Sequence, residues 1–341
     1  MKKLKFFDKI LWFINRVLAV VLLLSFVLPF LPPKTFSVLS VLSLGVALLI
    51  LVNVLFFLYW LVKLKKQFIL SLVVLAIGYF SFGSLYKFSS STHIEAPNNF
   101  KVMNYNVRLF NLYKWIPKDS IETKIIDLIK NESPDILSLQ EYHPHKNIDL
   151  SFFKYKYEKL SGKKTKYGQA IFSNFPIVNS GSVEFPDTSN NAIYADVVIQ
   201  KDTVRVYNIH LESMRIDTKV ENLKKENSER LFKRIGKTFR MQQFQSELFL
   251  IHKKQCTYKM IICGDFNNTA FSYVYRTIKG DLNDAFIEAG NGFGRTYDFK
   301  FFPIRIDFIF SDEAFSVNGF KAFNEHYSDH YPIMTTFAIR N

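Results

Sequence analysis

Long apolar runs fill the first part of the chain, and short ones separated by polar segments fill the rest. Residues 10–31, 36–62 and 68–86 form three nearly continuous apolar stretches. Each is close to the ~20 residues that a helix needs to cross a hydrocarbon core. We therefore predict a membrane region at residues 1–88 with three transmembrane helices.

The first of these stretches is the weakest because Asn15 and Arg16 interrupt it. We expect the Arg16 side chain to extend toward the N-terminal membrane surface. A cleaved signal peptide is the alternative for this stretch. No small-residue cleavage pattern follows Leu31, and two more apolar segments come after Pro32-Pro33, so the pattern favours a retained helix.

The short loops between the stretches differ in basic residues, and this predicts an orientation. The N-terminus and the second loop are lysine-rich, through Lys2, Lys3, Lys5, Lys9, Lys63, Lys65 and Lys66. The first loop has only Lys34. Because Lys and Arg accumulate on the cytoplasmic side, we predict an integral membrane protein with a cytoplasmic N-terminus. Three crossings then place everything after Tyr86 on the extracytoplasmic side.

The composition agrees with this division. Residues 1–88 contain ten Lys and Arg against one acid, Asp8, so they carry most of the formal net charge of +14. The basic balance is therefore a weak argument for nucleic-acid binding. A chain with 48% hydrophobic and 22% charged residues is neither disordered nor collagen-like, and two cysteines, Cys256 and Cys263, are too few for a disulfide framework.

Beyond the apolar region the chain predicts a linker and one further domain. Residues 89–99 are Ser-rich and polar, which is typical of a linker. In residues 100–341 short apolar runs alternate with polar or helical stretches, which predicts a mixed α/β domain. Its length of about 240 residues is compatible with one domain built on two packed sheets. The predicted strands are 101–106, 136–140, 169–173, 192–199, 204–210, 260–265, 306–311 and 333–339, and the predicted helices are 120–132 and 228–253.

Polar side chains of a few types occur where these strands begin or end. They lie in six motifs: NYN at 104–106, QE at 140–141, NIH at 208–210, GDFN at 264–267, RIDFIF at 305–310 and SDH at 328–330. Oxygen ligands dominate and thiolates are absent, so the set favours Mg²⁺ or Mn²⁺ over zinc. A hard cation beside His favours phosphoryl chemistry, and the lack of a GxxxxGK loop favours hydrolysis.

In this order the six motifs resemble those of the endonuclease/exonuclease/phosphatase superfamily, which includes deoxyribonuclease I, abasic-site endonucleases, neutral sphingomyelinases and inositol polyphosphate 5-phosphatases. The resemblance covers residues 100–341. It implies an α/β four-layer sandwich of two packed mixed β-sheets flanked by helices, here preceded by three transmembrane helices. It also implies a membrane-anchored, divalent-metal-dependent phosphoesterase in which water attacks phosphorus in line.

The resemblance further implies a metal site and the residues that hold the reacting groups. Glu141 is the expected main metal ligand, with Asn106 beside it and Asp329 completing the site. Asp265 is expected to orient or deprotonate the attacking water, and Asn267 to hold the phosphate. The ion is expected to be Mg²⁺ or Mn²⁺.

Two histidines complete the implied set. His330 is expected to act as a general base or a phosphate-stabilising imidazole, with Asp307 hydrogen-bonded to it so that its tautomer and pKa suit the task. His210 is expected on the leaving-group side, as a phosphate contact or proton donor. His143 and His145, just after Glu141, are expected to be inert residues of an exposed loop.

One position departs from the pattern of the family. Abasic-site endonucleases carry an Asp two residues after the Asn of the first motif, and this chain has Arg108 there. Because a cation cannot ligate a metal, Arg108 argues against a second ion and against abasic-site specificity. We expect it to contact a substrate phosphate instead.

The sequence leaves the substrate open between nucleic acid and a phospholipid-type phosphoester. Residues 214–240 contain nine Lys and Arg against four acids, which indicates either a solvated face or a rim that meets anionic lipid or a nucleic-acid backbone. The expected partners are the lipid bilayer and the phosphoester substrate, and no obligate protein partner is inferred. The alternative function is a catalytically silent, membrane-tethered binding or scaffold protein that retains the fold.

Overall fold

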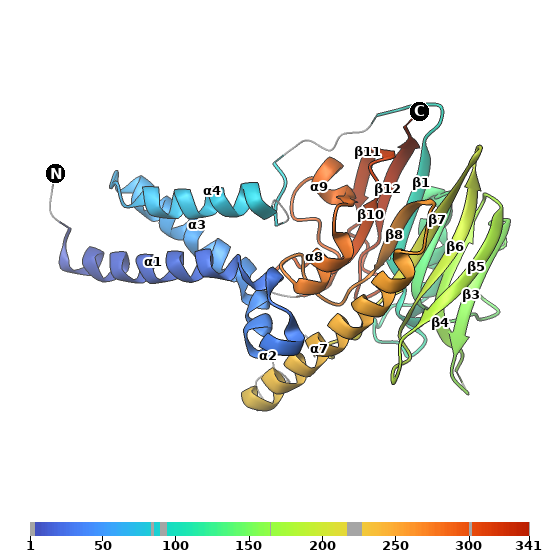
Figure 1. Ribbon diagram of the computed structural model, residues 1–341, viewed down its shortest axis with the longest axis horizontal. Helices are drawn as coiled ribbons and strands as arrows, with labels where there is room; N and C mark the ends of the chain where they lie inside the picture. Colours follow the sequence, from blue (N-terminus) through green and yellow to red (C-terminus); the bar gives the residue numbers. More distant parts are fainter. Residues whose placement is uncertain are drawn as a thin grey trace.

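Two packed β-sheets and a group of N-terminal helices make up the protein. The computed structural model describes residues 4–82, 85–88, 94–163, 165–216, 227–299 and 302–340. Part of the predicted linker, residues 89–93, and part of the basic stretch, residues 217–226, lie outside the described residues. The sheets lie at one end of the molecule, and the apolar helices extend away from them (Figure 1).

The two sheets have six strands each and are both mixed. In the first sheet the order is β11 (Phe315–Ala322), β12 (Ile333–Ile339), β1 (Phe100–Asn106), β2 (Ile136–Tyr142), β4 (Tyr167–Ser173) and β3 (Tyr155–Ser161). In the second it is β5 (Ile177–Glu184), β6 (Asn191–Ile199), β7 (Asp202–His210), β8 (Lys259–Asp265), β10 (Asp307–Ser311) and β9 (Asn283–Asp284). The pairs β1–β2 and β7–β8 are parallel, and each is joined by a helix.

Alternating side chains on each strand separate the layers. Val102 of β1 belongs to the apolar core between the sheets, whereas Met103 and Tyr105 pack on the other face of the strand. That outer face is covered by α5 (Ile121–Glu132), whose apolar stripe is Ile121, Ile125 and Ile129. This alternation follows from the two-residue period of a strand and the 3.6-residue period of a helix.

The outer face of the second sheet is covered in the same way. Phe249 of α7 (Ser228–Lys253) and Ile278 of α8 (Tyr273–Lys279) pack there on Ile262 and Phe308. A short helix, α9 (Ala285–Ala289), adds side chains to the core between the sheets. The order helix, sheet, sheet, helix confirms the predicted pair of mixed sheets flanked by helices.

All eight predicted strands and both predicted helices are present, but four strands were not predicted. These are β3, β5, β9 and β11, and each one lies at an edge of its sheet. The pattern in β3 and β5 is half-exposed along most of its length. An edge strand shares its apolar face with one neighbour only, so it lacks the continuous apolar run that reveals a central strand.

The N-terminal region contains more helices than the sequence predicted. They are α1 (Phe6–Ser25), η1 (Leu28–Phe30), α2 (Pro33–Val41), η2 (Leu42–Gly45), α3 (Val46–Val62) and α4 (Phe68–Phe82). Two helical segments, Phe6–Phe30 and Pro33–Val62, are long and apolar enough to cross a membrane, and the apolar helix at Phe68–Ser81 is shorter than that test requires. The structure therefore shows two candidate spans and a shorter third helix, where the sequence predicted three spans.

The second predicted span, residues 36–62, is not one straight helix. Phe36 has non-helical dihedral angles, and the 3₁₀ helix η2 separates α2 from α3. α2 instead packs against α7 of the sheet domain, where Val41 contacts a cluster with Ile235 and Phe239. Proline at the start of α2 and the turn at η2 allow this change of direction.

Polar contacts fix α2 on the sheet domain. Lys34 forms an ion pair with Glu247 of α7, and its backbone N–H donates to Gln243 Oε1 at 2.7 Å. On the neighbouring helix α8, the Arg276 guanidinium lies 4.0 Å from the ring centre of Phe30. The apolar helices are therefore packed on the domain through α2 and η1 and are more than a flexible tether.

Inside the helix group, polar side chains join α1, α3 and α4. Asn15 Nδ2 donates to Ser71 Oγ at 2.8 Å, and Trp60 Nε1 donates to Asn15 Oδ1 at 3.0 Å. Such contacts hold helices together where the surroundings are apolar. Arg16 is exposed and lies over Trp12 and Phe13, so its side chain extends toward the N-terminus. Its position at a membrane surface stays a prediction.

A fully buried polar network joins the two sheets. Gln140 Nε2 donates to Asn104 Oδ1 at 2.7 Å and to Asn208 Oδ1 at 2.6 Å, across the interface between β2 and β7. Asn208 Nδ2 in turn donates to the carbonyl of Leu139 at 2.8 Å. Because an unpaired polar group is costly in a dry interior, this network fixes how the sheets are aligned.

We expect Asn208→Ala to lower the free energy of unfolding by about 2–3 kcal/mol, because it removes one hydrogen-bond partner of the buried Gln140 amide and one of the Leu139 carbonyl. Denaturant unfolding of the purified full chain in detergent measures this. Asn324→Ala, at an exposed position, is the control and should change the value by less than about 0.5 kcal/mol. Equal effects of the two variants would show that the network does not stabilise the fold.

Candidate active site

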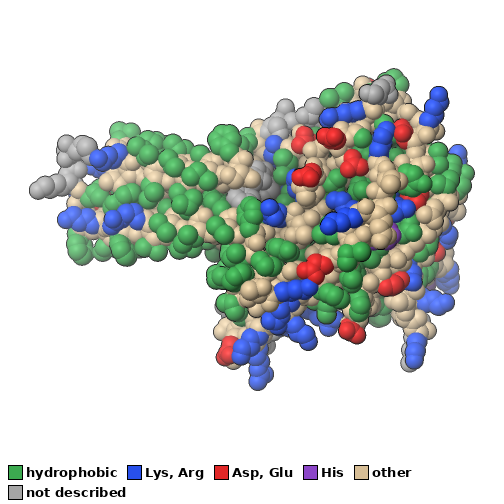
Figure 2. All heavy atoms as spheres, in the orientation of Figure 1, with side chains coloured by type: hydrophobic (Ala, Val, Ile, Leu, Met, Phe, Trp, Pro, Cys, Tyr) green, Lys and Arg blue, Asp and Glu red, His purple; other side chains and the backbone are tan. Residues whose placement is uncertain are grey.

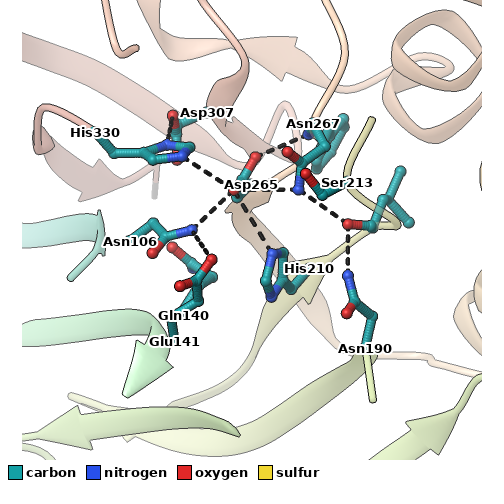
Figure 3. Close-up of polar contacts among 12 residues, drawn as sticks. Asn106, Gln140, Glu141, Asn190, His210, Ser213, Asp265, Asn267, Asp307 and His330 are labelled. Carbon is teal, nitrogen blue, oxygen red and sulfur yellow. Dashed lines mark hydrogen bonds and ion pairs between the residues drawn. The ribbon is translucent and has the colours of Figure 1, made fainter. Parts of the chain in front are cut away.

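The strand register brings the predicted site residues to one edge of the sandwich. In the first sheet Asn106 is opposite Gln140, at the carboxyl ends of the parallel strands β1 and β2. In the second sheet His210 and Asp307 are both opposite Asp265. The two edges lie side by side, and the side chains point toward a common centre (Figure 3).

Asp265 is the residue on which the others converge. Asn106 Nδ2, from the other sheet, donates to its Oδ2 at 2.9 Å, and the Asn267 backbone N–H donates to its Oδ1 at 2.8 Å. His330 Nε2 and His210 Nε2 lie 3.6 and 3.7 Å from Oδ2. Burial raises the pKa of Asp265, although the two histidines act in the opposite direction.

His330 makes the hydrogen bond that the sequence predicted. Its Nδ1 lies 2.9 Å from Asp307 Oδ2, so only Nε2 faces Asp265. The Asp307 backbone N–H donates to Thr296 Oγ1 at 3.0 Å, and the Tyr297 ring packs edge-on at 5.0 Å from the imidazole. Burial lowers the pKa of His330, but Asp307 and Asp265 outweigh it and raise that pKa well above its usual value.

His210 occupies a contrasting environment at the end of β7. Burial is the main effect on it and lowers its pKa, while Asp265 raises it. The centre therefore holds one imidazole that favours the charged form and one that favours the neutral form. Two histidines whose pKa values are shifted in opposite directions can take different roles in proton transfer.

Glu141 enters the centre from a distorted strand end. The register of β2 against β4 shifts between Leu139 and Tyr142, and Glu141 has a positive φ of 49°. A bulge of this kind re-aims a side chain at the cost of local strain. Glu141 Oε1 accepts from Asn106 Nδ2 at 3.3 Å, so Asn106 joins Glu141 to Asp265.

The donor set around Glu141 fits a hard cation. Burial and the nearby Asp329 both raise the pKa of Glu141, and no ion pair within the described residues involves it. A divalent ion would offset this accumulated negative charge through oxygen ligands. Asn106 faces the carboxylates with its amide nitrogen, because Oδ1 accepts from the Arg108 N–H at 3.1 Å, so an oxygen ligand from Asn106 requires the amide to rotate.

A second group of residues also satisfies the distances of a metal site. One ligand atom from each of Asp265, Asp307 and His330 lies within 4.8 Å of the others. In this group Asp307 Oδ2 and His330 Nδ1 are already hydrogen-bonded to each other. The oxygen-rich set at Glu141 therefore agrees better with the predicted ion than the group that contains His330.

Arg108 and Asp329 contact each other. The Arg108 guanidinium lies 3.2 Å from Asp329 Oδ2 and 4.5 Å from the ring centre of Trp115. It begins a turn, η3 (Arg108–Asn111), whose four residues all have positive φ. The phosphate contact predicted for Arg108 and the metal contact predicted for Asp329 both compete with this ion pair and stay predictions.

Several residues of the centre were not singled out from the sequence. Asn104, Gln140 and Asn208 belong to the recognised motifs but point into the seam between the sheets. Thr296 and Tyr297 come from an irregular segment without a motif, and only the fold brings them to His330. As predicted, His143 and His145 lie in a loop after β2; His143 Nδ1 contacts the Lys166 carbonyl.

Comparison with known proteins places the sheet domain in a known group. Residues 103–330 match the model of the Endonuclease/Exonuclease/phosphatase family, and residues 8–85 match a model described as a domain of unknown function, DUF8431. No curated protein sequence matches the chain.

Solved structures with the same fold include three from different organisms. A humanised D. rerio TDP2 is 16% identical, with a TM-score of 0.55 over 70% of this chain and 99% of that one. The human Nocturnin catalytic domain with bound sulfate is 19% identical, with a TM-score of 0.53 over 71% and 94%. The endonuclease/exonuclease/phosphatase from Bacteroides vulgatus is 17% identical, with a TM-score of 0.54 over 71% and 99%.

We expect Glu141→Gln to weaken Mn²⁺ binding about a hundredfold, because it removes the charge of the main expected ligand and keeps its shape. Calorimetric titration of the purified chain measures the affinity. Glu132→Gln, at the opposite end of the first sheet beside Lys101, is the matched control and should bind as the unaltered chain does. Loss of binding in Asp307→Asn but not in Glu141→Gln would place the ion in the other group.

Proposed function

Because the chain belongs to the endonuclease/exonuclease/phosphatase family, we propose that it is a membrane-anchored, divalent-metal-dependent phosphoesterase. It hydrolyses a phosphodiester or phosphomonoester by in-line attack of water. The observation that carries this proposal is the convergence on Asp265 of side chains from both sheets, with Glu141 joined to it through Asn106.

The contacts support a separate catalytic role for each residue. Glu141, with Asn106 and Asp329, would hold Mg²⁺ or Mn²⁺, which supplies charge stabilisation to the phosphoryl oxygens. Asp265 takes the proton of the attacking water. His330, held through Nδ1 by Asp307, presents Nε2 to the phosphate.

The other side of the centre would bind and release the substrate. Asn267 and His210 both contact the Asp265 carboxylate, which supports the proposal that Asn267 holds the phosphate and His210 faces the leaving group. The Arg108 guanidinium beside Asp329 would add a further phosphate contact if this ion pair is shared.

We also propose the predicted domain division and orientation: a membrane region at residues 1–88, a linker at 89–99 and a catalytic domain at 100–341. Asp8 of α1 accepts from Lys63 at the end of α3 at 2.5 Å, so the two lysine-rich flanks lie at the same end of the helices. Figure 2 shows basic side chains at this end, far from the sheets. Three crossings by α1, α3 and α4 would put these lysines in the cytoplasm and the catalytic domain outside.

Two substrate classes fit this site. One solved structure with the fold is described as D. rerio TDP2 complexed with single strand DNA product, which favours nucleic acid. The apolar helices packed on the domain favour a phosphoester within a membrane. If the chain is instead a catalytically silent scaffold, it should hydrolyse none of the substrates tested below.

The full chain in detergent should hydrolyse bis(p-nitrophenyl) phosphate with Mg²⁺ or Mn²⁺ and lose this activity with chelator. We expect Glu141→Ala, Asp265→Ala and His330→Ala each to lower the rate about 100- to 1,000-fold, because each removes a contact to the transition state. His145→Ala, in the exposed loop, is the control for His330→Ala. Activity that survives all three substitutions would refute the proposed site.

The orientation can be tested with single cysteines in a Cys256→Ser, Cys263→Ala background. Lys154→Cys, exposed on the sheet domain, should react with a membrane-impermeant maleimide in intact cells. Lys66→Cys, exposed between α3 and α4, should react only after permeabilisation. The opposite pattern would contradict an outward-facing catalytic domain.

A further inference from the structure

An apolar cavity of about 450 Å³ lies between the apolar helices and the sheet domain. One wall is made of η2 and the beginning of α3, with Leu44, Leu48 and Leu51, and the other is made of domain loops, with Met214, Phe271 and Phe302. Leu48 is 60% exposed and Leu51 is 41% exposed. The wall on α3 is therefore continuous with the surface that this helix would turn toward lipid.

The inner end of the cavity reaches the active site. Asn267 and Tyr297 both line it. Asn267 Nδ2 lies 3.4 Å from Asp265 Oδ2, and the Tyr297 ring packs on His330. A ligand in the cavity would thus have one end beside Asp265 and His330 and the other beside α3.

Few charges line this cavity. Among its described lining residues only Arg215 and Arg305 are charged, and Arg305 is paired with Asp284 at 2.7 Å in the interior. Arg215 lies at the surface near Glu212. A nucleic-acid strand needs a groove with several cations along its backbone, whereas an apolar channel with polar groups at its inner end fits an amphiphile.

We propose that this cavity holds the hydrocarbon chain of a membrane phospholipid whose phosphoester lies at Asp265. The lipid would enter along α3 without its chain leaving an apolar environment, and its phosphate would meet Asn267 and His330. This inference rests on the proposed phosphoesterase activity and membrane anchoring, and it selects phospholipid as the substrate class.

Gly45 offers a way to fill the cavity. It lines the cavity, has φ of −83°, and a Cβ built on it meets no atom within 4 Å. A phenylalanine there can extend into the space without a backbone clash. Leu48→Trp is a second filling variant at an exposed lining position, and Leu58→Phe, 46% exposed on α3 outside the lining, is the matched control.

Binding can be measured without hydrolysis. The full chain is reconstituted in phosphatidylglycerol nanodiscs with a diazirine on the acyl chain, irradiated in chelator, and the labelled peptides are identified. We expect labelling at Met214 and Phe271 that falls about tenfold in Gly45→Phe and Leu48→Trp, since displacing two methylenes already costs this much affinity. The inference would be overturned if the unaltered chain were not labelled at Met214 and Phe271. It would also be overturned if Gly45→Phe and Leu58→Phe were labelled equally.

Activity gives the second measurement and separates this inference from the proposed function. With metal, the ratio of phosphatidylglycerol hydrolysis to bis(p-nitrophenyl) phosphate hydrolysis should fall about tenfold in Gly45→Phe but not in Leu58→Phe. An unaltered ratio in Gly45→Phe would overturn the proposed lipid cavity without contradicting the proposed phosphoesterase activity. If Gly45→Phe instead lost only the hydrolysis of an oligonucleotide, the cavity would be assigned to nucleobases and the lipid inference would be overturned. No hydrolysis of any substrate by the unaltered chain would refute the phosphoesterase, while the labelling result would still decide what the cavity holds.

Discussion

The hydrogen bond between Asn106 and Asp265 is the contact on which the site depends. It joins the end of β1 in one sheet to the end of β8 in the other at 2.9 Å, and neither sheet alone contains the centre. Behind it, the buried contact between Gln140 and Asn208 fixes the alignment of the sheets. A displacement of one sheet against the other would separate Asn106 and Glu141 of the first sheet from Asp265 of the second.

The sequence predicted the central parts of the fold better than its margins. Central strands such as β8 are buried on both faces, so their sequence is a continuous apolar run that ends in a polar residue. The edge strands β3 and β5 are half-exposed and resemble loops in composition. α2 was assigned to a membrane span because its apolar residues form one run with α3, and only its packing on α7 separates the two helices.

The same difference applies to the site. Residues such as Asp265 and His330 lie in motifs whose register follows directly from the strands, and the contact between His330 and Asp307 is present as predicted. The pairing of Arg108 with Asp329 could not be predicted, because it depends on a turn of residues with positive φ. Tyr297 and the apolar cavity also arise from tertiary contacts between distant segments.

We propose that Glu141, Asp265 and His330 form one centre around a single divalent ion held at Glu141. Anomalous diffraction from crystals of the full chain soaked in Mn²⁺ tests it most directly. We expect one strong peak about 2 Å from a Glu141 carboxylate oxygen. A peak between Asp307 and His330, with none at Glu141, would contradict it.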